Sequence, residues 1–255
     1  MTHPKIIGII PARYGSTRFP GKPLVTIQGK SLIQRTYENA LLCKSLTTVV
    51  VATDDDRIYE HMLSFGGNVV MTSESCVNGT DRLVEVIERN PIYQDAFIIV
   101  NIQGDEPCLE PDIVEKVIEQ LLKSPSAVMS TAVMKLTNKE DALSSSVVKC
   151  VLDQQGNVLY FSRSLIPGSK SQEFNPATTY YKHLGIYVYR KEFLLRYPHL
   201  SSTPLQLTED LEQLKVLEHG FRITAAVVES KSIGVDNPED IKKVEQLLCI
   251  QNSSL

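Results

Sequence analysis

The sequence lacks the cysteine patterns that organise disulfide-rich or zinc-binding domains. It has five cysteines among 255 residues, an odd number, and none of them is spaced as Cys-x-x-Cys. A disulfide framework and a zinc site are therefore both disfavoured, and a reducing compartment fits this cysteine usage.

Long apolar runs and an excess of basic residues are absent too. No stretch of 18 or more apolar residues occurs, so we expect no transmembrane helix and no membrane insertion. The first residues run directly into a short apolar segment without the long core and cleavage site of a secretory signal, so we expect a cytoplasmic protein. The net charge of −4 argues against nucleic-acid binding, although a small anionic substrate needs only a local positive cluster.

Short apolar runs alternate with amphipathic segments in the first half of the chain. We predict strands near residues 5–10, 48–52, 68–71 and 96–102, and helices at about residues 31–42, 57–65, 81–89 and 111–122. This alternation predicts an α/β fold with a mostly parallel sheet. Ligands of such folds bind beyond the carboxyl ends of the strands, which is where unusual polar segments follow in this sequence.

The second half has a different character. Turn-rich polar sequence separates the strands that we predict at 147–152, 158–161 and 184–189, and we interpret roughly 130–200 as a β-rich elaboration with an exposed loop at 167–179. A helix at about 208–219, a strand at 223–228 and a helix from about 238 to 250 follow. For the last helix, Asn237 is the expected N-cap and Pro238 the first helical residue. We treat residues 1–255 as a single domain.

The segment after the first predicted strand is cationic. Arg13, Arg18 and Lys22 fall within one loop, and Gly15 and Gly21 give its backbone the freedom to wrap a ligand. Three cations and free backbone N–H groups make a cradle for a nucleoside triphosphate. The alternative, a solvated surface loop, is weakened by the position of the segment at the end of a strand of a parallel sheet.

This loop is not a Walker A loop. A Walker A loop has four residues between its glycines and then Lys-Ser or Lys-Thr. Here five residues separate Gly15 from Gly21, and Pro23 follows Lys22 without supplying a hydroxyl for Mg²⁺. A P-loop kinase or ATPase is therefore disfavoured.

Two aspartates are candidate metal ligands. Asp105 follows the buried strand near 96–102, and Asp236 precedes the last predicted helix. Each is by itself equally consistent with a turn or a helix cap. Together beside a triphosphate they would repel it unless a divalent cation were bound between them, so their meeting would require a metal.

Eight segments, in their order along the chain, resemble the 3-deoxy-manno-octulosonate cytidylyltransferases. They include Pro-Ala-Arg-Tyr-Gly-Ser-Thr-Arg-Phe-Pro-Gly-Lys-Pro-Leu at 11–24 and Val-Asn-Ile-Gln-Gly-Asp-Glu-Pro at 100–107, and the others lie at 51–54, 78–82, 160–163, 183–187, 209–217 and 234–240. The resemblance implies a single nucleotidyltransferase domain. Its fold would be three-layered and Rossmann-like, with a mostly parallel sheet and a β-rich elaboration for homodimer formation.

The resemblance also implies the chemistry. CTP and 3-deoxy-manno-octulosonate (KDO) would react with Mg²⁺ as cofactor to give CMP-KDO for lipopolysaccharide synthesis, together with pyrophosphate. The implied catalytic residues are Arg13, Lys22 and Asp105, and the implied metal ligands are Asp105 and Asp236. The implied nucleotide-binding residues are Pro11, Ala12, Arg13, Gly15, Arg18, Lys22, Asn78, Gly79, Thr80, Arg82 and Asp105. The implied sugar-binding residues are Gln103, Arg163, His183, Tyr187, Glu209 and Glu212.

The residues themselves are partly consistent with these implied sugar roles. Arg163 suits the carboxylate of KDO because arginine binds carboxylates bidentately, although an arginine after a strand is commonly only a surface residue. His183 is locally typical of a core histidine with one satisfied nitrogen. Glu209 and Glu212 are spaced to share one face of the helix predicted at 208–219, with Leu207, Leu211, Leu214 and Leu217 on its core face.

Three departures from the family pattern bear mainly on details of base recognition: Gly15 where alanine is common, Asn78 where serine is usual, and Asp81 where glutamate is common. Three alternatives stay open. The first is a cytidylyltransferase for another acidic sugar such as N-acylneuraminate. The second is a metal-dependent sugar-nucleotide glycosyltransferase, for which residues 54–56 offer a formal Asp-x-Asp at an expected helix start. The third is a non-catalytic nucleotide-sensing module.

Overall fold

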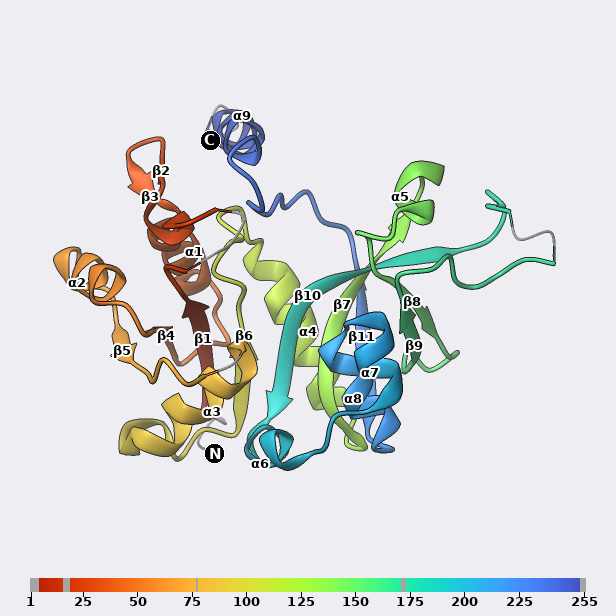
Figure 1. The fold of residues 1–255 in the computed structure, drawn as a ribbon, viewed down its shortest axis with the longest axis horizontal. Coiled ribbons are helices and arrows are strands. Elements are labelled where there is room, and N and C mark those ends of the chain that lie inside the picture. Colours follow the sequence, from red (N-terminus) through yellow and green to blue (C-terminus); the bar gives the residue numbers. More distant parts are fainter. Residues whose placement is uncertain (1–4, 16–18, 77, 171–172, 253–255) are drawn as a thin grey trace. The chain divides into compact units, whose positions relative to one another are not determined.

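The computed structural model describes residues 5–15, 19–76, 78–170 and 173–252 (Figure 1). The chain forms two compact units. We call residues 1–115 together with 231–255 the first unit, and residues 116–230 the second unit. Each unit is described by itself. No helix among the described residues is long and apolar enough to cross a membrane.

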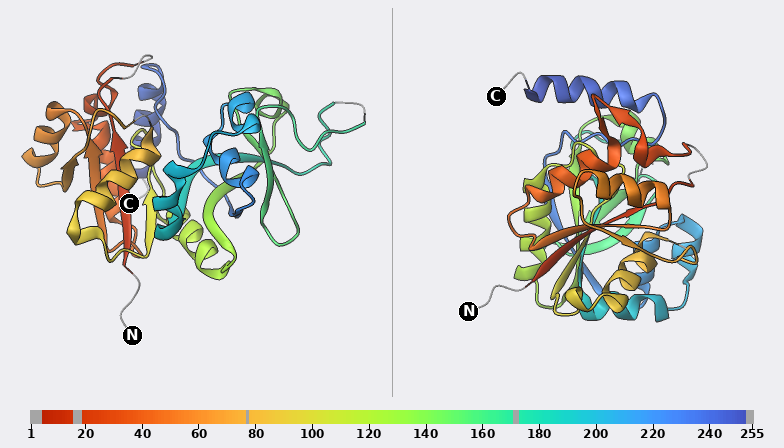
Figure 2. Two further views of the ribbon diagram at one scale, coloured as in Figure 1. Left: turned by 60° about the horizontal axis from the view of Figure 1, so that its bottom comes forward. Right: turned by 90° about the vertical axis from the view of Figure 1, so that its left-hand side faces the viewer.

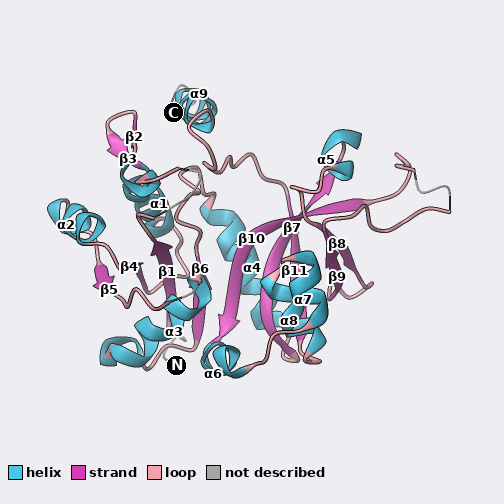
Figure 3. Cartoon of the chain, in the orientation of Figure 1, coloured by secondary structure: helices cyan, strands magenta, loops and turns pink. Residues whose placement is uncertain are grey.

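The first unit is built on parallel strands (Figure 3). In space their order is β6 (Ile98–Asn101), β1 (Ile6–Ala12), β4 (Thr48–Thr53) and β5 (Val69–Met71), and every neighbouring pair is parallel. Their side chains are largely buried on both faces of β1, β4 and β6, as expected of a sheet covered on both sides. The four strands predicted in the first half of the sequence are confirmed.

Capped helices connect these strands. The helices are α1 (Leu32–Leu41), α2 (Asp56–Ser64) and α3 (Gly79–Arg89). Ser31, Asp55 and Asn78 are their N-caps, and each side chain accepts a hydrogen bond from a backbone N–H of the first turn. The short elements of this unit are η1 (Lys22–Leu24), β2 (Thr26–Ile27), β3 (Lys30–Ser31) and η2 (Pro91–Tyr93).

The last helix, α9 (Asp240–Asn252), belongs to the first unit although it lies far from it in sequence. Figure 2 shows α9 beside the β2–β3 hairpin. Val235 and Val244 are buried there in a cluster with Ile27 and Leu32. The helix starts two residues later than predicted, because the Asp240 carboxylate accepts the N–H groups of residues 236 and 237 and closes a turn before the helix.

The second unit is a mixed sheet with flanking helices. It contains β7 (Ala127–Leu136), β8 (Lys149–Leu152), β9 (Val158–Ser162), β10 (Tyr180–Arg190) and β11 (Arg222–Val228). The order β11-β7-β10 combines a parallel and an antiparallel pair, and β8 pairs antiparallel with β10 and β9. Strand β7 and the short helices α5 (Lys139–Leu143), α6 (Lys191–Arg196) and η3 (Tyr197–His199) were not predicted separately. Helix α4 (Pro111–Lys123) leads from the first unit into this one.

The single helix predicted at 208–219 is wrong. Two short helices, α7 (Pro204–Glu209) and α8 (Glu212–Glu218), occupy this stretch. Asp210 separates them, because it adopts a left-handed backbone with φ of 51° that no helix interior accepts. Glu209 and Glu212 therefore end one helix and begin the next instead of sharing a helical face. Leu207, expected in the core, has 68% of its surface exposed.

A bulge in β10 brings two predicted site residues together. His183 pairs with Val133 of β7 and Tyr187 with Thr131, so four residues of β10 span only two of β7. Because a bulge interrupts the regular alternation of side chains, residue spacing alone does not decide their faces, but the two rings are in contact. Their ring centroids are 5.5 Å apart, much closer than in a regular strand.

Candidate active site

The loop after β6 approaches the end of β1 closely. Pro11 and Ala12 are the last residues of β1, and the missing N–H of Pro11 interrupts no ladder with β6, whose pairing with β1 ends at Asn101. The loop after β6 crosses here. A Cβ at Gly104 would lie 2.8 Å from the Pro11 carbonyl oxygen, so only glycine fits without a backbone shift.

Tyr14 contacts the far end of the cationic loop at Gly21. Its carbonyl accepts the N–H of Gly21, which has φ of 72°, and a Cβ at Gly21 would lie 3.1 Å from the Tyr14 ring. The guanidinium of Arg57, a residue of α2, lies 3.3 Å from the centroid of the Tyr14 ring. Asp55 accepts two hydrogen bonds from this guanidinium and so holds it in place. The first part of the loop is thus fixed.

The structure describes two of the three other predicted binding residues of this loop. Arg13 and Gly15 are exposed at the end of β1. Arg18 lies outside the described residues. No hydrogen bond or ion pair joins the Arg13 side chain to another described residue.

Lys22 is the point at which three distant segments meet. Its Nζ lies 2.7 Å from Asp105 Oδ2 and donates a hydrogen bond of 2.8 Å to the carbonyl of Val235. The Val235 N–H in turn donates to the Asp105 carbonyl at 2.9 Å. The predicted convergence of the loop with the Asp105 and Asp236 segments is therefore present, because Asp236 follows Val235 directly.

Side chains of the loop after β6 hold the segment that carries Asp236. Glu106 accepts a hydrogen bond from the Ser232 hydroxyl at 2.6 Å, and Glu110 accepts the N–H of Lys231 at 2.7 Å. A Cβ at Gly234 would lie 3.1 Å from a Glu106 carboxylate oxygen. Asp236 itself is exposed at the end of this segment.

The donor set here suits a hard cation. The Lys22 ammonium, a cation, is held by a carboxylate oxygen of Asp105 and the carbonyl oxygen of Val235, which are the ligand types that Mg²⁺ takes. Among the described residues no group of three or more His, Cys, Asp or Glu side chains is arranged to hold a metal ion. The residues therefore fit a metal that takes its other ligands from water and phosphate, which is how Mg²⁺ commonly binds in nucleotide sites.

The amino end of α3 lies against the end of β1. A Cβ at Gly79 would lie 3.4 Å from the Pro11 ring, and Asn78 caps the helix by accepting the Asp81 N–H at 2.8 Å. Asparagine is among the residues that cap helices best, so Asn78 suits this position. Thr80 is buried in the first turn.

Arg82 is buried, with 4% of its surface exposed. Its guanidinium lies 2.6 Å from Asp54 Oδ2 and also donates to the Thr72 hydroxyl. In the fold it therefore ties α3 to the end of β4. A direct contact with the nucleotide stays a prediction for this residue.

The formal Asp-x-Asp at 54–56 has other functions. Asp54 pairs with the buried Arg82, Asp55 caps α2 and pairs with Arg57, and Asp56 is in the first turn of that helix. This is the helix start expected from the sequence, and it accounts for the acidic residues without a metal.

In the second unit, Arg163 and Glu209 are held together. The Arg163 N–H donates to Glu209 Oε2 at 2.9 Å, and its Nε donates to the Glu209 carbonyl at 2.7 Å. The Ser162 hydroxyl donates to the other carboxylate oxygen at 2.6 Å. Burial alone would raise the pKa of Glu209, but these hydrogen bonds lower it below its ordinary value, so the carboxylate is charged.

His183 is a buried neutral imidazole. Its Nε2 lies 2.9 Å from the Thr131 hydroxyl oxygen, and that hydroxyl donates to the Ile186 carbonyl at 2.8 Å. Since the hydroxyl has one proton, His183 is the donor in the first bond and its Nδ1 is left as an acceptor. Burial lowers the pKa of His183 to about 3. The sequence interpretation of a core histidine with one satisfied nitrogen is confirmed.

Tyr187 lies beside His183. Its hydroxyl donates to Gln213 Oε1 at 3.3 Å, and burial, with the charge of Glu212, raises its pKa. Glu212 is exposed at the first position of α8. The five sugar-site residues predicted in the second unit thus share one region, whereas Gln103 is half-buried in the loop after β6 of the first unit.

This chain is similar to known proteins over most of its length. A profile of the Cytidylyltransferase family matches residues 7–231. A Protochlamydia amoebophila protein named 3-deoxy-manno-octulosonate cytidylyltransferase is 59% identical over 251 residues, covering 98% of this chain and 97% of the relative. A Zea mays protein of that name is 52% identical, covering 97% of this chain and 82% of the relative. This chain belongs to the 3-deoxy-manno-octulosonate cytidylyltransferase family.

Solved structures confirm the fold class of this cytidylyltransferase family member. The structure of CMP:2-keto-3-deoxy-manno-octonic acid synthetase complexed with CTP matches with a TM-score of 0.90 and 38% identity, covering 97% of this chain and 99% of the other. A 4-diphosphocytidyl-2C-methyl-D-erythritol synthase from Anaerococcus prevotii matches with a TM-score of 0.65 at 15% identity and covers 97% of this chain and 99% of the other. The second likeness concerns the nucleotidyltransferase fold alone.

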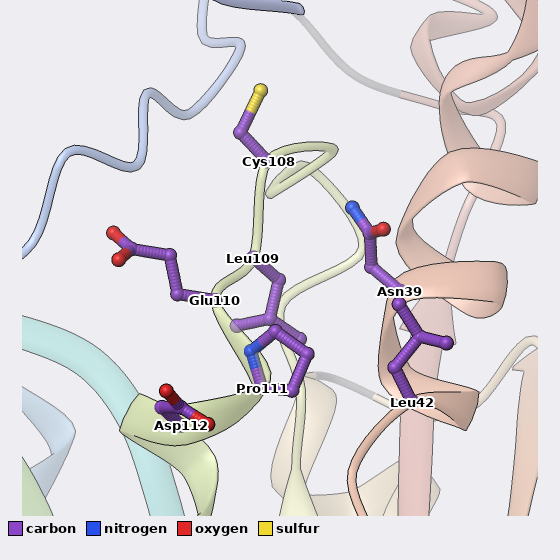
Figure 4. Close-up of a pocket in the computed structure, with 7 residues that line it drawn as sticks. All are labelled: Asn39, Leu42, Cys108, Leu109, Glu110, Pro111 and Asp112. Atoms are coloured by element: carbon purple, nitrogen blue, oxygen red, sulfur yellow. The ribbon is translucent and has the colours of Figure 1, made fainter. Parts of the chain in front are cut away.

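A separate hollow lies elsewhere on the first unit of the cytidylyltransferase. It has a volume of about 450 Å³ and is lined by Asn39 and Leu42 from the α1 side and by residues 108–112 from the loop before α4 (Figure 4). None of the predicted site residues lines it. Its walls are partly apolar and partly acidic, which does not suit a triphosphate.

Sequence reasoning missed several residues of the cytidylyltransferase site. Tyr14 in the cationic loop is held by a contact with the Arg57 guanidinium. Gln213 accepts a hydrogen bond from the Tyr187 hydroxyl. Lys149 is buried beside Arg163. The sequence signal for these residues was that two of them, Tyr14 and Gln213, lie within the family segments. Their contacts depend on pairs of residues far apart in the chain.

Proposed function

We propose that this chain transfers CMP from CTP to the anomeric hydroxyl of KDO. The hydroxyl oxygen forms a bond to the α-phosphorus, the bond from that phosphorus to the oxygen bridging the α- and β-phosphates breaks, pyrophosphate leaves, and the hydroxyl proton passes to solvent. The observation that supports this most directly is the convergence of Lys22, Asp105 and the 235–236 segment beyond the ends of parallel strands. Family membership supports the choice of CTP and KDO.

The first unit supplies the nucleotide contacts in this proposal. Arg13 and Lys22 bind the phosphates as catalytic cations, with Arg18 assisting, and Gly15 leaves the backbone of the loop accessible. Pro11 and Ala12 form the floor at the end of β1. The amino end of α3, from Asn78 to Thr80, lies against Pro11 and offers backbone N–H groups to the nucleotide.

Magnesium is proposed as the cofactor, with Asp105 and Asp236 as its ligands. When bound, Mg²⁺ would neutralise phosphate charge and lower the pKa of the attacking hydroxyl. The Asp105 carboxylate is at present paired with Lys22. Lys22 would therefore exchange Asp105 for a phosphate oxygen as the nucleotide binds, which places its positive charge on the group that leaves as pyrophosphate.

Arg163 is the proposed anchor for the carboxylate of KDO. A guanidinium has five N–H groups. Three donate to the carbonyl oxygens of Glu209, Ser145 and Asp210. Nη2 also lies 3.9 Å from Asp210 Oδ2, an ion pair beyond hydrogen-bond distance, so among the described residues the other two N–H groups have no hydrogen-bond acceptor. Two free N–H groups are what a bidentate carboxylate needs. Neutral His183 contributes a hydrogen-bonding group to this region without a charge.

Pyrophosphate release tests the proposal. Each nucleoside triphosphate is combined with KDO, N-acetylneuraminate or no sugar, with and without Mg²⁺. Release with CTP, KDO and Mg²⁺ together is the expected result. Preference for N-acetylneuraminate would favour the cytidylyltransferase for another acidic sugar, and release with no sugar acid or none under any condition would contradict the proposal. A glycosyltransferase would release a nucleotide from a sugar nucleotide instead.

Asp105→Ala tests the metal and phosphate site. We expect turnover to fall at least about a hundredfold, equivalent to roughly 2.7 kcal/mol of transition-state stabilisation. The matched control is Asp112→Ala, an exposed aspartate in the first turn of α4, which should retain normal turnover. Near-normal turnover of a folded Asp105→Ala protein would contradict the assigned role.

Two further properties belong to the proposal. A homodimer formed through the second unit is supported by exposed aliphatic side chains of Leu159, Leu207 and Val227. Light scattering should then give twice the 28.5 kDa mass of one chain, and Leu159→Asp should lower the measured mass.

A cytoplasmic location fits five free cysteines, among which Cys43, Cys108 and Cys150 are buried.

A further inference from the structure

Lys149, a lysine that the proposed chemistry does not use, is completely buried in the second unit. Its exposed fraction is 0%, which is rare for a lysine. The side chain extends from the first residue of β8, and its ammonium donates to three backbone carbonyls: Ser144 at 2.7 Å, Val147 at 2.6 Å and Arg163 at 2.5 Å. An ammonium has three N–H donors, so every one of them has an acceptor.

A buried cation is costly, and within the described part of the chain no carboxylate pairs directly with this one. Burial lowers the pKa of Lys149, while the nearby Glu209 charge raises it and the Arg163 charge lowers it. The energetic cost is offset by three charge-assisted hydrogen bonds to carbonyl dipoles. These hydrogen bonds stabilise one backbone conformation, because a shift of the three carbonyl groups would leave the Lys149 ammonium without acceptors.

The backbone that Lys149 holds is that of Arg163. From the other side, Glu209 accepts the Arg163 N–H and the Ser162 hydroxyl. The peptide groups before and after the Arg163 Cα are therefore fixed by two opposite charges, Glu209 at the N–H and Lys149 at the carbonyl. The guanidinium is fixed separately by carbonyls of residues 145, 209 and 210.

We propose that Lys149 is a positioning residue of the sugar-acid site, which fixes Arg163 so that its two free N–H groups meet the carboxylate of a ulosonic acid bidentately. This inference rests on the proposed function, because it takes Arg163 as the carboxylate anchor. Bidentate binding requires a fixed plane of the guanidinium, since a displacement of about 1 Å can cost orders of magnitude in rate. The positive charge of Lys149 also offsets the negative charge of Glu209, which makes the surroundings of Arg163 less repulsive to an anion.

In this arrangement the effect of Lys149 on the binding of KDO requires Arg163. A double-mutant cycle measures how far the effect of one residue depends on the other. The variants are Lys149→Met, which keeps the length of the side chain, Lys149→Gln, which keeps an N–H donor group, Arg163→Ala, and both double variants. Lys135→Met, a change of an exposed lysine on β7, is the matched control. The KM for KDO is measured at saturating CTP, the KM for CTP at saturating KDO, and the unfolding temperature of each protein establishes that it is folded during the assay.

We expect both Lys149 variants to raise the KM for KDO about tenfold or more and to leave the KM for CTP within about twofold of the original. In the Arg163→Ala background the same changes should add less than about threefold. The control should match the unchanged protein.

Four results would overturn the assignment: an unchanged KM for KDO, an equal rise in both KM values, full additivity with Arg163→Ala, or failure of both Lys149 variants to fold, which would make the residue purely structural. A normal KM for KDO in Arg163→Ala would instead remove the carboxylate role of Arg163 and this inference with it, while CMP transfer itself would stand. Absence of CTP- and KDO-dependent pyrophosphate release from the unchanged protein would count against the proposed function alone.

Discussion

The buried imidazole of His183 makes the stability of the second unit depend on pH. In the folded chain the ring is enclosed by Phe161, Tyr187 and the Thr131 hydroxyl, and burial lowers its pKa from 6.5 to about 3. In the unfolded chain the ring is in water and takes up a proton near its ordinary pKa. Below pH 6.5 the unfolded state therefore binds a proton that the folded state does not.

The sign and the size of the effect follow from this difference. The contribution to stability is fully present above pH 6.5 and is lost as the pH falls toward 3, because protons then favour the unfolded chain. The slope is about 1.4 kcal/mol per pH unit, so lowering the pH from 6.5 to 5 should reduce the free energy of unfolding by about 2 kcal/mol. His61, whose pKa burial also lowers, contributes in the same direction.

Comparison with His183→Gln isolates this residue, because His61 is present in both proteins. Urea unfolding followed by circular dichroism at pH 8, 7, 6 and 5 should give a pH dependence about 2 kcal/mol smaller for the variant. In parallel, imidazole C–H resonances in NMR spectra should show one histidine that stays neutral at pH 5 and is missing from the variant. His199→Gln, a change of an exposed histidine, should keep the original slope. Equal slopes for the original and His183→Gln proteins, or titration of that resonance near pH 6.5, would refute the reasoning.

Two further changes test the framework of the nucleotide site. Asp54→Asn leaves the buried guanidinium of Arg82 without its carboxylate and should lower the free energy of unfolding by about 3 kcal/mol or more in urea titrations. Asp95→Asn breaks an exposed ion pair and should cost less than about 1 kcal/mol, so equal losses would contradict burial as the cause. Gly104→Ala places a methyl group 2.8 Å from a carbonyl oxygen of β1 and should lower kcat/KM at least about tenfold by displacing the Asp105 loop. Gly168→Ala, with no atom within 4 Å of the new methyl group, should be silent, and matching kinetics for the two glycine variants would show that the close approach is unimportant.

The parallel strands and the capped helices of the first unit could be predicted because their signals are local. Buried strands such as β1 are runs of apolar residues, and Ser31, Asp55 and Asn78 mark the helix starts by their side-chain oxygens. The position of the cationic loop after β1 then followed from the general rule for ligands of parallel sheets.

The second unit was harder to predict because its decisive features are not periodic. The break between α7 and α8 depends on a left-handed aspartate, a conformation that no pattern of apolar residues reveals. The bulge in β10 depends on its pairing with β7, a strand more than forty residues earlier in the chain. Lys149 looks from its sequence like a solvated lysine, and only tertiary contacts supply its three carbonyl acceptors.

The sequence by itself determined the fold class, the family and the types of chemical groups available: a loop of cations, two separated aspartates and an arginine suited to a carboxylate. These follow from residue identities and their order, which local propensity and likeness to relatives can interpret. Only the tertiary structure decided that Lys22 pairs with Asp105 and contacts the segment before Asp236, and that Arg163 is fixed between Glu209 and Lys149. Those contacts join residues far apart in the chain, and their distances depend on how the elements pack, which a linear pattern does not encode.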